Sequence, residues 1–105
     1  MTQFCVYRNK NPSTKGTFPY LLDVQADLLE DLHTRVVIPL TKTATYAKRP
    51  LQILTPVIVV DGAEYIAMTP QLAGIAKSDL GPRVTVVSEY REALIAAMDL
   101  LITGV

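Results

Sequence analysis

The chain has 105 residues, half of them apolar and 19% charged, and its ten basic and ten acidic side chains cancel. This length predicts a single domain over residues 1–105, the hydrophobic content excludes a disordered chain, and the neutral balance argues against a strongly basic nucleic-acid groove. No apolar run reaches the roughly 18 residues of a membrane span, and no signal peptide is recognisable, so we expect a cytoplasmic protein. One cysteine and one histidine cannot form an internal disulfide or a closed zinc site.

The first third of the chain alternates between apolar and polar residues with a period of two, which predicts strands at residues 3–8 and 20–25. Between them, residues 9–17 are polar and rich in turn-forming types, which predicts an exposed hairpin tip. Residues 26–33 are expected to form a turn or a short helix. This part of the chain therefore predicts an antiparallel pair of strands followed by a compact connection.

The next expected strand, residues 34–41, also alternates in hydrophobicity. Its inward face is predicted to consist of Val36, Ile38 and Leu40. Arg35 is expected on the outward face, and Pro39, which has no amide hydrogen to donate, predicts an edge strand or a bulge. Residues 42–54 give no pattern beyond a loop with one helical turn.

In the second half, residues 56–60 are apolar on both faces, which is typical of a central strand. Residues 61–62, an Asp-Gly pair, predict a tight turn, and residues 64–69 form the returning strand of the hairpin. Residues 70–76 are expected to form a turn with a short helical piece, and residues 83–87 form the last strand.

From Ser88 onward the period changes to 3.6, which predicts a helix capped by Ser88 and ended by Gly104. Its core stripe is expected to consist of Tyr90, Leu94, Ala97, Met98 and Leu101. Ile95 and Ile102 lie beside each other away from that stripe and flank a polar strip that includes Asp99. An apolar chain end of this kind indicates either a wide buried helix face or an interface.

The sequence offers few candidates for chemistry. His33 could act as a general base, with Arg35 contacting a phosphate, in a metal-independent ribonuclease. Four loosely spaced carboxylates do not match a calcium loop and are typical of a solvated turn: Asp23, Asp27, Glu30 and Asp31. Cys5 lies between apolar neighbours and is expected to be a small buried hydrophobe.

Several segments together resemble the CcdB family of toxins from bacterial toxin–antitoxin modules. The specific parts are an Asp-Val-Gln-x-Asp-apolar-apolar stretch at residues 23–29 and a Val-Ile-Pro-Leu stretch at residues 37–40. Residues 3–7, residues 56–59 and the final helix with its terminal Gly104-Val105 agree as well, so the likeness covers nearly the full length.

The resemblance implies a mostly β (α+β) fold: an SH3-like β-barrel of antiparallel strands with a small second sheet and one C-terminal α-helix. It implies a homodimer that catalyses nothing and uses no cofactor or metal. Its expected partners are the A subunit of DNA gyrase, which the family poisons by trapping the cleaved gyrase–DNA complex, and a CcdA-like antitoxin. Neither direct nucleic-acid contact nor membrane contact is expected.

Position by position, the family's gyrase-binding residues fall on Leu28, Leu29, Asp99, Ile102, Thr103, Gly104 and Val105. Thr103 replaces the tryptophan of the best-known pattern, and Asp99 replaces a common asparagine. Because tryptophan is a large interface anchor, its loss is expected to weaken gyrase binding or to shift the anchor to the neighbouring apolar residues. Two alternatives to a gyrase poison remain. Thr103 suggests a non-toxic CcdB-like binding protein, and the shared barrel allows a MazF/Kid-like endoribonuclease on the same fold.

Overall fold

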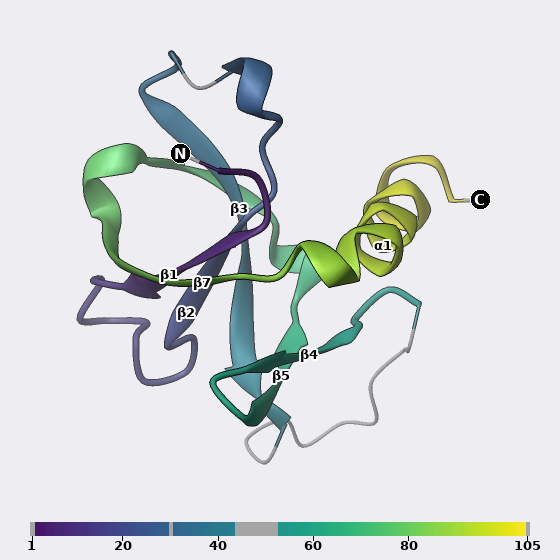
Figure 1. Cartoon of the computed structure of the whole chain (residues 1–105), viewed down its shortest axis with the longest axis horizontal. Helices are drawn as coiled ribbons and strands as arrows, with labels where there is room; N and C mark the ends of the chain where they lie inside the picture. The colour runs from purple at the N-terminus through teal and green to yellow at the C-terminus, as the bar shows by residue number, and fades with distance from the viewer. Residues whose placement is uncertain (1, 30, 44–52, 105) are drawn as a thin grey trace.

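The computed structural model describes residues 2–29, 31–43 and 53–104. Within them, seven strands form one curled antiparallel sheet, and a helix packs against it near the C-terminus (Figure 1). The strands are β1 (Cys5–Asn9), β2 (Tyr20–Asp23), β3 (Thr34–Lys42), β4 (Val57–Val60), β5 (Ala63–Ala67), β6 (Ala73–Ala76) and β7 (Leu80–Val86). The helix is α1 (Arg91–Thr103), and short 3₁₀ turns are η1 (Asp27–Leu29), η3 (Thr69–Gln71), η4 (Lys77–Asp79) and η5 (Ser88–Tyr90). This arrangement confirms the mostly β, SH3-like expectation.

The strand order is β4-β5-β3-β2-β1-β7, and β6 pairs with β3. The small second sheet that the resemblance implies is continuous with the main one, because β5 is hydrogen-bonded to β3. The hairpin predicted with strands at residues 56–60 and 64–69 is confirmed as β4 and β5. Its turn places Asp61 at φ 49° and Gly62 at φ 80°, the conformation that two-residue hairpins favour. The polar tip, predicted at residues 9–17, occupies residues 10–19 and joins β1 to β2.

Both faces of the central strands are buried, which produces two apolar clusters. On one side, Phe4 and Val6 join the larger core beneath α1, and on the other, Cys5 and Tyr7 join a second cluster under β6 and β7. Figure 1 shows the segment from β6 to β7 arching over one side of the sheet, which explains the second cluster. The alternation predicted for the first strand is thus confirmed, and Cys5 is buried, as expected.

The expectation for β3 was wrong in two respects. Arg35 is fully buried rather than outward, because the arch from β6 to β7 covers that face and Asp23 supplies a partner. Pro39 lies in a central strand and not at an edge. On the side of β3 away from β2, the neighbouring strand changes at Pro39: β6 pairs with Thr34–Val37, and β5 pairs with Leu40–Lys42. The Pro39 carbonyl accepts a hydrogen bond from the Met68 N–H at 2.9 Å, and no ladder donor is required at that point.

Two further strand predictions need correction. β4 is an edge strand and not a central one, and Val57 and Val59 are partly exposed on it. Residues 73–76, expected to be a turn, form β6 along the first part of β3, because pairing with a central strand stabilises a short small-residue segment that has no alternating pattern of its own. The last strand also begins earlier than predicted, at Leu80.

Helix α1 ends as expected, with Gly104 at φ 73° and its N–H bonded to the Leu100 carbonyl at 3.0 Å. At its start, Tyr90 is the N-cap and makes no side-chain capping bond, so the predicted Ser88 cap is wrong. Leu94 and Ala97 are fully buried, as the predicted stripe requires. No helix in the described ranges is long and apolar enough to cross a membrane.

Candidate partner-binding site

The C-terminal end of α1 is an apolar surface exposed to solvent. Ile102 is 75% exposed and Leu101 is 39% exposed, and Thr103 and Gly104 are exposed beside them. Leu101 was expected in the core, but it is exposed with Ile102. Figure 1 shows this end of the helix projecting away from the strands. Val105, the remaining expected residue of this end, lies outside the described residues.

The polar side of the same helix forms a shallow hollow of about 300 Å³. It is lined by Arg91, Glu92, Ile95, Ala96 and Asp99. Of the two isoleucines beside the core stripe, Ile95 packs partly against the larger core, as the wide-face alternative predicts, whereas Ile102 is exposed. The Thr103 hydroxyl donates to the Asp99 carbonyl at 2.6 Å, which holds the threonine side chain against its own helix.

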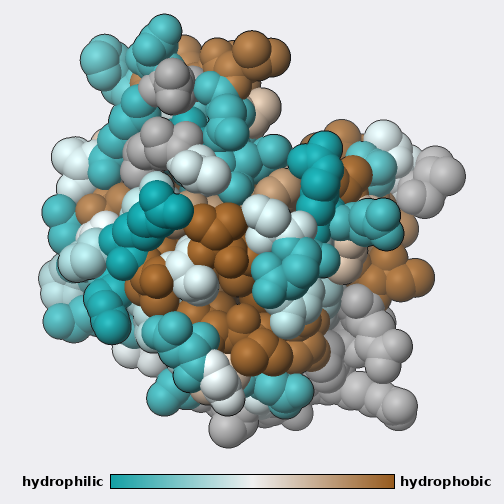
Figure 2. Space-filling view, in the orientation of Figure 1, coloured by the Kyte–Doolittle hydropathy of each residue, from teal (hydrophilic) through white to brown (hydrophobic). Residues whose placement is uncertain are grey.

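The second expected part of the site is η1, the predicted short helix in residues 26–33. Leu28 is 95% exposed and Leu29 is 48% exposed, and Leu32 just beyond is 48% exposed. None of the residues in this turn is buried. Figure 2 shows hydrophobic atoms gathered at the top of the molecule over η1 and again at the right, near the end of α1. Within one chain these two apolar surfaces are separate (Figure 1).

A buried ion pair is connected to η1 through Gln25. The Arg35 guanidinium donates through Nε to Asp23 Oδ2 at 2.7 Å and through Nη2 to Asp23 Oδ1 at 3.0 Å, and both side chains are fully buried. Nη2 also donates to the Gln25 carbonyl at 3.2 Å, and the Gln25 N–H donates to Asp23 Oδ1 at 3.0 Å. Sequence analysis missed this pair, although the pairing of β2 with β3 places Asp23 opposite Val37, two residues from Arg35.

Gln3 connects η1 to the start of α1. Its N–H donates to Asp27 Oδ1 at 2.7 Å, and its side-chain amide donates to the Val24 carbonyl at 3.1 Å. Arg91 donates through Nη1 to Gln3 Oε1 at 3.3 Å, and its guanidinium lies 5.7 Å from the centre of the Phe4 ring. The N-terminal segment therefore bridges the two elements that carry the expected site residues.

The geometry contradicts the ribonuclease pair and the acidic cluster. Because Arg35 is sealed in its pair with Asp23, it cannot contact a phosphate beside the exposed His33. Asp23 is likewise buried, so it does not belong to a solvated acidic turn; Asp27 and Asp31 are exposed, and Glu30 lies outside the described residues. No group of three His, Cys, Asp or Glu side chains suited to a metal occurs in the described part of the chain.

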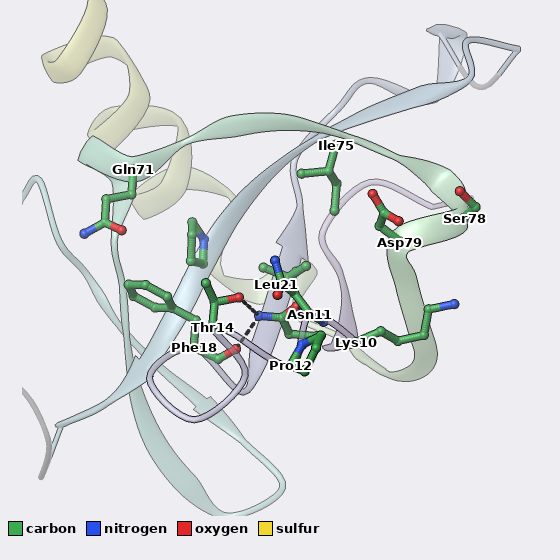
Figure 3. A pocket seen from close by; sticks show the side chains of 12 residues that line it. Lys10, Asn11, Pro12, Thr14, Phe18, Leu21, Gln71, Ile75, Ser78 and Asp79 are labelled. Atoms are coloured by element: carbon green, nitrogen blue, oxygen red, sulfur yellow. Dashed lines mark hydrogen bonds between the residues drawn. The ribbon is translucent and has the colours of Figure 1, made fainter.

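A pocket of about 600 Å³ lies elsewhere, between the hairpin tip and the arch. Figure 3 shows Phe18 and Gln71 at one end of it, Lys10 and Asp79 at the other, and Ile75 reaching down from β6. Leu21 and Pro39 contribute to its apolar lining. It contains none of the expected site residues.

Comparison with known proteins assigns the chain to a family. A model of the CcdB protein family matches residues 3–104, which is nearly the whole chain. The chain belongs to the CcdB family. CcdB proteins are the toxins of toxin–antitoxin modules, so this chain is a toxin-family protein.

A solved structure has a similar fold. The chain is similar to an endoribonuclease in complex with its cognate antitoxin from a mycobacterial species, with a TM-score of 0.76 and 16% sequence identity. The match covers 98% of this chain and 95% of that chain. At this level of identity the likeness is one of fold.

Proposed function

We propose that this CcdB-family chain acts as a homodimer that binds the A subunit of DNA gyrase and traps the cleaved gyrase–DNA complex. A CcdA-like antitoxin is proposed to neutralise it. The observation that carries the proposal is the exposed apolar end of α1, where Ile102 protrudes from a helix whose other face is buried. A surface of this kind is costly to leave in water unless a partner covers it.

The charge pattern favours a protein partner over nucleic acid. Ten basic and ten acidic residues give no net charge, whereas direct binding to DNA relies on an excess of lysine and arginine. Asp99, in the hollow beside Ile102, suits a basic side chain on the partner. We therefore expect gyrase to bury the apolar end of the helix and to make one charged hydrogen bond with Asp99 beside it.

The two exposed surfaces are proposed to act together. Leu28 and Leu29 on η1 are separate from Ile102 within one chain, and a two-fold dimer presents two copies of each surface to a symmetric partner. Thr103 adds little apolar area because its hydroxyl is bonded to its own helix. The contribution of the missing tryptophan must then come from Ile102 and the leucines of η1.

The test is binding to a purified fragment of the gyrase A subunit that contains its dimerisation region. Ile102→Ser is compared with Val59→Ser, a control on the edge strand β4, because Val59 is 45% exposed there and is not one of the expected gyrase-binding residues. Burying an isoleucine contributes about 1.5–3 kcal/mol, and three quarters of that surface is available at Ile102, which predicts a loss of roughly 7- to 45-fold in affinity. The control is expected to bind like the wild type.

A growth assay tests the consequence in cells. Expression without antitoxin should stop the growth of a sensitive bacterium and spare a strain with a resistant gyrase. Normal growth of the sensitive strain, together with retained antitoxin binding, would favour the non-toxic alternative. No detectable binding of the wild type to the gyrase fragment at tens of micromolar would refute the proposal.

A further inference from the structure

The exposed turn η1 has no apolar anchor of its own. None of its residues is buried, yet it presents Leu28 at 95% exposure in a defined conformation. A three-residue 3₁₀ turn is weak in isolation, because its hydrogen-bond geometry is poor and few bonds offset the ordering of its backbone. Contacts from outside the turn must therefore fix its position.

One side chain makes the contact at the end of the turn. Gln25 is 6% exposed, and its amide nitrogen donates to the Leu29 carbonyl at 2.9 Å. Its side-chain oxygen accepts from the Val36 N–H on β3 at 3.1 Å. A single buried amide thus joins the end of η1 to a central strand of the sheet, and only a group that both donates and accepts can make the two bonds.

The backbone of Gln25 is fixed as well. Its N–H donates to Asp23 Oδ1 at 3.0 Å, and its carbonyl accepts from Arg35 Nη2 at 3.2 Å. All four hydrogen-bonding groups of this residue are therefore used, two on the buried ion pair and two through the side chain. The ion pair orients Gln25, and Gln25 orients η1.

We propose that Gln25 is a positioning residue for partner binding: it holds η1 so that Leu28 and Leu29 meet the partner without first having to be ordered. This inference rests on the proposed gyrase contact. Ordering an otherwise mobile segment on binding weakens affinity, whereas a segment that is already fixed avoids that cost. Gln25 itself touches no partner, since it is buried beneath the turn.

Asn9 provides a matched control elsewhere in the fold. It is also a buried amide, 9% exposed, and its nitrogen donates to Thr14 Oγ1 and to the Phe18 carbonyl, both at 2.9 Å. Its side-chain oxygen accepts from the Asn11 N–H at 3.0 Å. Asn9 thus fixes the hairpin tip in the way that Gln25 fixes η1, but at a surface without expected partner contacts.

The experiment compares Gln25→Glu with Asn9→Asp in the full-length protein. Each change keeps the accepting oxygen and removes the donating nitrogen. Hydrogen exchange is measured at the Leu29 and Leu32 amides, which donate to Ala26 and Leu29 carbonyls at 3.0 and 3.1 Å. Affinity for the gyrase A fragment and the melting temperature are measured on the same samples. Gln25→Met serves as a second variant if the buried carboxylate prevents folding.

The expected result for Gln25→Glu is faster exchange at both amides and an affinity at least fivefold weaker. Asn9→Asp is expected to lower the melting temperature by a comparable amount while leaving exchange in η1 and affinity within twofold of the wild type. The inference is overturned if the Gln25 variants loosen η1 and still bind within twofold, or if Asn9→Asp weakens binding equally. It is also overturned if exchange in η1 does not change in either Gln25 variant. A wild type that fails to bind gyrase refutes the proposed function instead, and the exchange data still decide whether Gln25 positions η1.

Discussion

Removal of Arg35 should be one of the most destabilising changes available in this chain. The guanidinium and the Asp23 carboxylate are both fully buried and joined by two bonds of 2.7 and 3.0 Å. Arg35→Met leaves the carboxylate buried, with the Gln25 N–H as its remaining hydrogen-bond donor among the described residues. An uncompensated buried charge of this kind costs about 3–5 kcal/mol.

That loss is large relative to the whole stability of a small domain. Unfolding free energies are commonly about 5–15 kcal/mol, and about 1 kcal/mol shifts the melting temperature of a domain of roughly this size by about 4–8 °C. Arg35→Met should therefore lower the melting temperature by at least about 12 °C. The reciprocal variant, Asp23→Leu, leaves the guanidinium unpaired and should lose a similar amount.

The double variant separates charge burial from packing. Replacing both partners with apolar residues of similar size removes the isolated charge, so Asp23→Leu with Arg35→Met should recover most of either single loss. The assay is urea unfolding followed by circular dichroism, with the free energy compared at equal denaturant dependence. A single Arg35→Met loss below 1 kcal/mol, or a double variant that loses the sum of both single changes, would refute the reasoning.

Three smaller changes test other features. Gly81→Ala should cost about 1–3 kcal/mol because a Cβ there would lie 2.7 Å from a backbone oxygen, whereas Gly16→Ala, with nothing within 4 Å, should change the melting temperature little. Burial raises the pKa of Tyr7 to about 12 from the ordinary 10, so stability should fall as the pH rises from 10 to 12. In Tyr7→Phe a pH series of urea unfolding curves should show a smaller fall, reduced by about 1.4 kcal/mol per unit of the Tyr7 pKa shift, and the remainder includes Tyr65, whose pKa is also raised by burial. Tyr90→Phe removes the hydroxyl that accepts from the Val59 N–H at 3.1 Å and should cost about 0.5–1.5 kcal/mol in the same assay; no measurable cost would mean that water replaces this bond fully.

The strands with clear alternation could be predicted from the sequence, and those without it could not. In β1 and the residue before it, Phe4 and Val6 alternate with Cys5 and Tyr7, and the two pairs lie in the two different clusters, as alternation predicts. β6 was missed because its residues, Ala-Gly-Ile-Ala, show no alternation of apolar and polar side chains. They form a strand only because they pair with β3. β4 was placed centrally because apolar residues on both faces resemble a buried strand, whereas Val57 and Val59 face outward at an edge.

The candidate site was predictable in part for similar reasons. Ile102 was singled out because it lies off the core stripe of α1, and its exposure is confirmed. The burial of Arg35 could not be foreseen, because a lone arginine in an alternating strand is usually solvated and its partner lies twelve residues earlier, on a neighbouring strand. Gln25 likewise carries no signal in composition, since its role depends on the Leu29 carbonyl and the Val36 N–H, which only the folded chain brings to either side of its amide.

The arch from β6 to β7 has a consequence for how this protein can diversify. With clusters on both sides of β1, β2 and β3, few residues of those strands can change without disturbing an interior. New recognition properties must then arise in the segments that the double-sided interior leaves free: η1, the hairpin tip and the outer half of α1. A single scaffold can thereby keep its architecture while its descendants acquire different targets.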